Sequence, residues 1–124
     1  MQRIELTIPR EREFSAVADL VLAGLASRLD LTLETIDDLQ LALESLLEHG
    51  ESNEQLTVLF ELAHGVIHTY VGPFDRSSIE PELAAVSGGG GIGLRRLLDT
   101  TVDFVSLTER DGACWVELRK EITV

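Results

Sequence analysis

Five glycines crowd one short segment, residues 87–93, directly before a helical pattern. They are Gly88, Gly89, Gly90, Gly91 and Gly93. Glycine loses more conformational freedom on folding than any other residue, so this cluster is unfavourable unless the backbone adopts positive φ angles or a ligand approaches closely. The unpaired N–H groups and positive dipole end of the following helix suit an anion such as phosphate. The segment predicts either a phosphate-binding loop or a flexible linker, and the glycines alone favour neither.

The other reactive side chains form no catalytic pattern. The three histidines, His49, His64 and His68, show no spacing typical of a zinc site, so we expect no metal trio. No serine lies in a Gly-x-Ser-x-Gly turn. Cys114 and Trp115 fall in an expected strand, which predicts a packed thiol and a core or interface anchor.

Composition limits the classes of function. The 124 residues fit one domain, 1–124, and 44% hydrophobic with 26% charged residues is typical of a folded globular protein. A net charge of −12 repels phosphate backbones and anionic lipids, so we expect neither a nucleic-acid nor a membrane partner, but a basic protein surface. The single cysteine fits a cytoplasmic location, and neither an export signal nor a membrane span is expected.

Two hairpins and one leading strand are expected from alternating apolar and polar residues. The leading strand covers residues 3–8 and ends at Pro9. Residues 55–62 and 66–71 form one expected hairpin around His64 and Gly65. Residues 102–109 and 113–122 form the other, and its Asp111-Gly112 pair is a strong turn signal.

Helical spacing appears in three further segments, with a short helical turn between about 77 and 83. The segments are 12–29, 32–49 and 92–99. Thr32 is the expected N-cap of the second helix. Its expected apolar face is Leu33, Ile36, Leu39, Leu43, Leu46 and Leu47. In the third helix, Arg95 and Arg96 are expected to face solvent or a ligand.

This order of elements predicts an α+β fold, a two-layer α/β sandwich. We expect a mostly antiparallel mixed sheet of about five strands with the helices on one face. A doubly wound nucleotide-binding fold is disfavoured, because two helices separate the first strand from the first hairpin and the glycines follow a loop.

Several stretches in this order resemble the GHKL, or Bergerat-fold, histidine-kinase-like ATPases, and specifically the anti-sigma-factor serine kinases of bacterial partner switches. The resemblance covers nearly the whole chain. It rests on residues 4–9 (IELTIP), 37–44 (DDLQLALE), 88–94 (GGGGIGL), 97–99 (LLD), 102–103 (VD) and 115–120 (WVELRK). It implies ATP and Mg²⁺ as cofactors, with Gly89, Gly90, Gly91 and Gly93 wrapping the phosphates and Arg95 or Arg96 neutralising charge.

The second helix corresponds to the segment that carries the family's acid–base and magnesium residues. The resemblance implies Glu44 as the catalytic glutamate, and Glu48 replaces the asparagine that holds Mg²⁺ in the family. Residues four apart share a helix face, and carboxylate oxygens suit Mg²⁺. A register one residue later would pair Ser45 with His49, and a solvated acidic helix face is the alternative without a site.

The stretch that corresponds to the adenine-binding box is incomplete. Residues 70–75 (YVGPFD) keep Gly72 and Asp75, which the resemblance places beside the nucleotide, but lack the aspartate that binds the adenine amino group. Pro73 also removes a backbone donor. Loss of one buried hydrogen bond to a base costs about 1–3 kcal/mol, or roughly tenfold to a hundredfold in affinity.

The resemblance therefore implies an anti-sigma regulatory factor of the serine/threonine-kinase type. Such a homodimer binds a sigma factor, is released by an anti-sigma antagonist, and uses ATP to phosphorylate a serine of that antagonist. The incomplete boxes leave a second hypothesis, a degenerate, non-catalytic module of the same fold that binds proteins but no longer binds ATP. A dimerisation domain without a sigma partner is a third.

Overall fold

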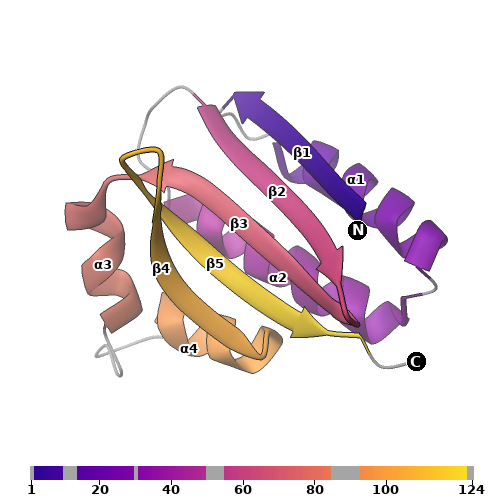
Figure 1. Cartoon of the computed structure of the whole chain (residues 1–124). Helices are drawn as coiled ribbons and strands as arrows, with labels where there is room; N and C mark the ends of the chain where they lie inside the picture. Colours follow the sequence, from indigo (N-terminus) through magenta and orange to yellow (C-terminus); the bar gives the residue numbers. More distant parts are fainter. Residues whose placement is uncertain (1, 10–13, 30, 50–54, 85–92, 123–124) are drawn as a thin grey trace.

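The computed structural model describes residues 2–9, 14–29, 31–49, 55–84 and 93–122, which form five strands and four helices (Figure 1). In chain order these are β1 (Gln2–Pro9), α1 (Phe14–Leu29), α2 (Leu33–His49), β2 (Gln55–Ala63), β3 (Val66–Phe74), α3 (Arg76–Ala84), α4 (Leu94–Thr101), β4 (Phe104–Arg110) and β5 (Ala113–Glu121). Within these residues, no helix is long and apolar enough to cross a membrane.

The strands form one sheet in the order β1-β2-β3-β5-β4, and every neighbouring pair is antiparallel. Both predicted hairpins are present. His64 and Gly65 have φ values of 52° and 76°, and Asp111 and Gly112 have the same two values. Two consecutive positive φ values are typical of the tight turn that matches strand twist, which explains the glycine in each second position.

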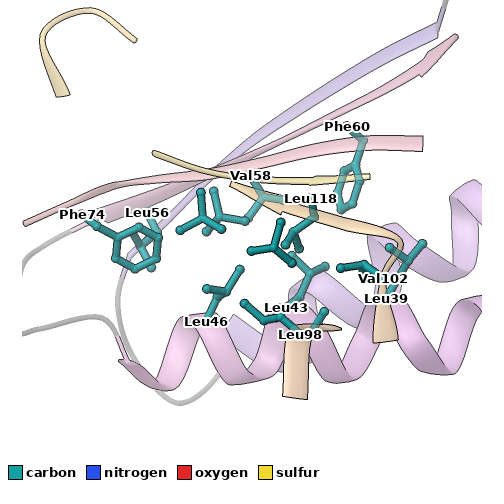
Figure 2. Close-up of a cluster of buried hydrophobic side chains, with 14 of the residues drawn as sticks. Leu39, Leu43, Leu46, Leu56, Val58, Phe60, Phe74, Leu98, Val102 and Leu118 are labelled. Carbon is teal, nitrogen blue, oxygen red and sulfur yellow. The ribbon is translucent and has the colours of Figure 1, made fainter. Parts of the chain in front are cut away.

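The main hydrophobic core lies between the sheet and the helices (Figure 2). Helix α2 begins at Thr32, whose Oγ1 accepts a hydrogen bond from the Thr35 N–H at 3.2 Å, so the predicted N-cap is confirmed. From this start, Leu39, Leu43 and Leu46 recur on one face of the helix and are fully buried. Burial of each leucine side chain contributes about 1.5–3 kcal/mol to folding.

The expected α+β class, with helices packed on one face of a five-stranded sheet, is confirmed. Two details differ. The sheet is wholly antiparallel rather than mixed, because β2 runs against β1, and β5, the strand beside β3, runs against both β3 and β4. Leu33, expected to face inward, is 73% exposed, because it is the first residue of α2 and precedes the part of that helix that meets the sheet.

Candidate functional site

The glycine segment ends at Gly93, which is the N-cap of α4. Gly93 has φ −69° and ψ 158°, and its carbonyl accepts a hydrogen bond from the Leu97 N–H at 3.1 Å. Within the described residues, no side chain caps this helix start. The first N–H groups of α4 are therefore not bonded by a capping side chain, as an anion site requires. Gly89, Gly90 and Gly91 lie outside the described residues.

An open hollow of about 600 Å³ lies between the C-terminal end of α3 and helix α4. Its lining residues are Leu83, Ala84, Arg95, Arg96 and Asp99. Arg95 Nε donates to both carboxylate oxygens of Asp99 at 3.1 Å, so that guanidinium is already paired. Arg96 is exposed and has no ion-pair partner within the described part of the chain. Of the two predicted arginines, Arg96 is the one available to an anion.

The two predicted acids lie on α2, which packs against α4, and Glu44 is not among the residues that line this hollow. Glu44 is half-buried. Glu48 lies one turn later in the same helix, and its side chain is not among the described parts of the structure. The alternative register is weakened, because Ser45 is buried and its hydroxyl donates to the Leu41 carbonyl at 2.8 Å. Of Glu44 and Ser45, Glu44 is therefore the more accessible side chain.

Gly72 is covered by the indole ring of Trp115 on the neighbouring strand β5. A Cβ atom on Gly72 would lie only 2.6–2.9 Å from three ring atoms of Trp115. Gly72 itself is buried, and the β3–β5 register is irregular between Val71 and Phe74. Packing against the indole ring therefore requires glycine at this position without any nucleotide.

Asp75 is the N-cap of α3. Its Oδ1 accepts hydrogen bonds from the Ser77 N–H at 3.2 Å and the Ser77 hydroxyl at 3.0 Å, and its carbonyl accepts from the N–H groups of Ser78 and Ile79. Capping of this kind satisfies donors that would otherwise have no partner at the helix start. The carboxylate already has a structural role.

Substitution of Asp75 tests this capping role. We expect Asp75→Ala to lower the free energy of unfolding by about 0.5–2 kcal/mol, because Ser77 loses its acceptor. Asp75→Asn keeps a side-chain oxygen and is expected to retain most of that stability. Urea unfolding of both variants measures the difference, and equal losses in the two would contradict the capping role.

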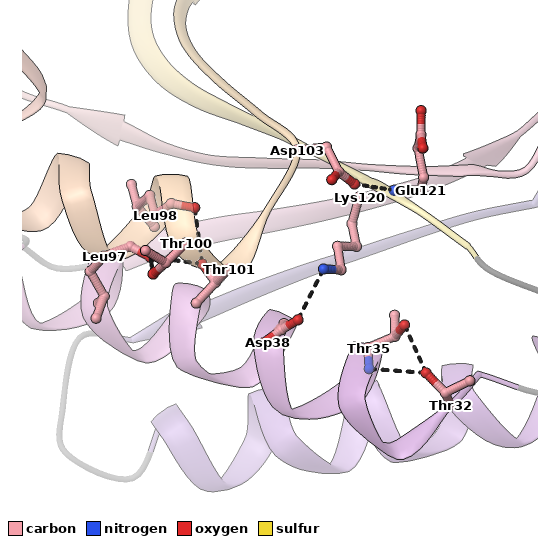
Figure 3. A network of polar contacts seen from close by, with 10 residues as sticks. All are labelled: Thr32, Thr35, Asp38, Leu97, Leu98, Thr100, Thr101, Asp103, Lys120 and Glu121. Carbon is pink, nitrogen blue, oxygen red and sulfur yellow. Dashed lines mark hydrogen bonds and ion pairs between the residues drawn. The ribbon is translucent and has the colours of Figure 1, made fainter.

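A second polar region links α2 to the end of β5 (Figure 3). Lys120 Nζ lies 2.9 Å from Asp38 Oδ2, and the Glu121 N–H donates to Asp103 Oδ2 at 2.7 Å. These pairs border a hollow of about 290 Å³. Lys120 and Asp38 neutralise each other, and Asp103 accepts the Glu121 N–H, so we interpret the region as a structural clamp between helix and sheet.

The remaining predicted groups have ordinary environments. Cys114 is buried, and that burial raises the pKa of its thiol, so the thiol stays protonated at neutral pH. His64 lies in the exposed β2–β3 turn and His68 on the sheet. Within the residues that the structure describes, no three His, Cys, Asp or Glu side chains converge as metal ligands.

Comparison with known proteins identifies the relatives of this fold. No family model matches the chain. The serine-protein kinase RsbW of Halalkalibacterium halodurans is 29% identical over 90% of this chain and 78% of its own length. The proteins of the same name from Listeria innocua and Bacillus velezensis are each 26% identical, over 89% and 88% of this chain and 82% and 79% of their own lengths.

A solved structure has the same fold. The crystal structure of the RsbU and RsbW domains of a Mycobacterium tuberculosis protein matches 98% of this chain with a TM-score of 0.69. The two sequences are 16% identical, and the chain spans 32% of that longer protein. With the sequence relatives, this match confirms the resemblance that the motifs indicated and the expected fold class.

Proposed function

Since this chain is related to the serine-protein kinases RsbW over about nine-tenths of its length, we propose that it is an anti-sigma regulatory factor of the serine-kinase type. In this proposal it forms one cytoplasmic domain, 1–124, that pairs with a second copy. It binds a sigma factor and is released by an anti-sigma antagonist. The observation that carries the proposal is the shared sequence across the whole fold, helped by the acidic charge of −12, which favours basic protein surfaces.

The phosphate end of the proposed site fits a nucleotide. Among the residues that the structure describes, none caps the start of helix α4 with its side chain, and the exposed Arg96 lines the hollow beside it. Backbone N–H groups and a guanidinium are the donors that phosphate oxygens accept. We propose that Gly89, Gly90, Gly91 and Gly93 hold the phosphates there.

The acidic residues of α2 complete the proposed site. Glu44 is the proposed acid–base residue, which would take the proton of the attacking serine hydroxyl, and Glu48 is the proposed Mg²⁺ ligand. ATP bound with Mg²⁺ would supply the phosphoryl group and the counter-charge. Gly72 and Asp75 would lie on the adenine side of the proposed site. Gly72 would shape that side by packing under the Trp115 ring, and Asp75 by capping the start of α3.

The second candidate is a module of the same fold that binds its protein partners without a nucleotide. The structural roles of Gly72 and Asp75 favour it, because neither residue needs a ligand to explain its presence. Titration with Mg-ATP separates the two candidates.

Capture of partners from the source cell tests the regulatory role. The tagged full chain is expected to enrich a sigma factor and an antagonist protein, identified by mass spectrometry against a tagged protein of similar charge. Because the proposed attraction is partly electrostatic, the yield is expected to fall as salt rises. A bait that never enriches either class of protein would exclude the regulatory role and leave the dimerisation domain.

A further inference from the structure

The hollow between α3 and α4 has an apolar side and a charged side. Among the described residues, α3 contributes Leu83 and Ala84 to its lining, and α4 contributes Arg95, Arg96 and Asp99. Leu83 is buried and Ala84 is exposed, so the α3 side presents hydrocarbon to a ligand. Two arginines and one aspartate leave the α4 side with one positive charge, which suits an anion.

One charged group on the α4 side is available to a ligand. Arg95 Nε donates to both carboxylate oxygens of Asp99 at 3.1 Å, so these two side chains are already paired. Arg96 is exposed, and a guanidinium has five hydrogen-bond donors and no acceptor. Asp99 is the only side chain with an acceptor in the described lining, and Arg95 holds it. The hollow therefore offers donors to phosphate oxygens but no free acceptor to an amino group.

Recognition of one base rather than another needs a hydrogen-bonding group aimed at the edge of that base. Adenine presents an amino donor where guanine presents a carbonyl acceptor. A site built to hydrogen-bond a ligand group can reject an analogue that lacks it by about 10⁴–10⁵-fold, whereas apolar contact discriminates far less. Such a group would be expected in residues 70–75, the stretch that corresponds to the adenine-binding box.

The last four residues of that box, 72–75, end β3 and lead into α3. Gly72 carries no side chain, and Pro73 has neither a polar side chain nor a backbone N–H. Phe74 is packed into the hydrophobic core (Figure 2). Asp75 is thus the only side chain of the four with a hydrogen-bonding group, and its Oδ1 accepts from the N–H and the hydroxyl of Ser77. The one carboxylate that could accept the adenine amino group is committed to the start of α3.

We propose that this site selects its ligand by the phosphates and not by the base, so that nucleoside triphosphates with different bases bind alike. The inference rests on the proposed function, because it concerns the same nucleotide site, and it widens the phosphoryl donor from ATP to nucleoside triphosphates as a class. Arg96 and the first N–H groups of α4 supply contacts that all these ligands share. The apolar end of α3 contacts the ring of any base without recognising its edge.

Calorimetric titration of the full chain with the Mg²⁺ complexes of ATP, GTP and inorganic tripolyphosphate tests the inference. The dissociation constants for ATP and GTP are expected to differ by less than about fivefold, because apolar contact discriminates weakly. Tripolyphosphate is expected to bind as well, and adenosine, which has no phosphate, is not. A larger preference for either nucleotide, tripolyphosphate that fails to bind where ATP binds, or binding of adenosine alone would overturn the inference.

Variants of Arg96 test the phosphate side. Arg96→Gln is expected to weaken all three phosphate ligands about tenfold or more and in similar proportion, because it removes charge-assisted hydrogen bonds. Arg28→Gln makes the same charge change at an exposed position in the last turn of α1 and is the matched control, expected to bind like the wild type. Wild-type affinity in Arg96→Gln would contradict the inference.

A variant of Asp75 tests the base side. Asp75→Asn keeps one acceptor oxygen for the α3 cap and replaces the other with a donor amide. We expect the ratio of the ATP and GTP affinities to stay unchanged. If Asp75 recognised the base, the new donor would favour the guanine carbonyl, and a shift of that ratio toward GTP would overturn the inference.

Failure of this inference is distinguishable from failure of the proposed function. A strong preference for ATP over GTP would refute the inference alone and leave the serine-kinase proposal in place. Absence of binding by all three phosphate ligands, in a chain shown to be folded by circular dichroism, would refute the nucleotide chemistry of the proposed function and this inference with it.

Discussion

Gly72→Val is expected to destabilise the protein by about 1–3 kcal/mol or more, because its first side-chain atom would lie 2.6–2.9 Å from the Trp115 ring. The overlapping atoms belong to the rigid indole ring rather than to the far end of a flexible side chain, so the ring cannot move away cheaply. The midpoint of urea unfolding measures the loss. Gly24→Ala is the control, because a Cβ there meets nothing within 4 Å.

A double variant identifies the cause. If overlap with the indole ring is responsible, Trp115→Leu in the Gly72→Val background is expected to restore part of the lost stability, as a double-mutant cycle would show. If the double variant instead loses as much stability as the two single variants together, the clash is not what makes glycine necessary at position 72.

Gly91→Val is expected to abolish Mg-ATP binding while leaving stability close to that of the wild type. The proposed phosphate contacts come from the backbone, and a branched side chain would keep the phosphates from approaching it. Calorimetric titration measures the affinity and urea unfolding the stability. Gly24→Ala again provides the control. Unchanged affinity in Gly91→Val would exclude the glycine segment as the phosphate site.

Local patterns in the sequence account for most of the observed fold. The Asp111-Gly112 turn, the Thr32 cap and the apolar spacing of α2 act over a few residues, and each was predictable from those residues alone. Leu33 shows the limit of periodicity, because the pattern cannot say where along a helix the packing partner begins.

Contacts between distant strands could not be predicted in the same way. Alternation indicated the β4–β5 hairpin but not that β5, rather than β4, pairs with β3. That pairing places Trp115 over Gly72. A glycine that the family resemblance placed beside a nucleotide thus has a packing role that only the tertiary structure reveals.

Some features of the candidate site were likewise predictable from neighbouring residues in the sequence, whereas others depend on contacts between distant elements. The helix start at Gly93 and the exposed Arg96 follow from nearby sequence. The capping role of Asp75 was not predicted, although aspartate just before a helix start is a common cap. Where Glu44 lies relative to the hollow beside α4 depends on how α2 and α4 pack, which no local pattern encodes.

Calorimetric titration of the wild-type full chain with Mg-ATP tests the serine-kinase assignment most directly. We expect a single binding event with a dissociation constant in the micromolar range, about −8 kcal/mol, and a matching rise in melting temperature. Absence of both heat and thermal shift at millimolar Mg-ATP would contradict it and establish the fold here as a protein-binding module without nucleotide chemistry.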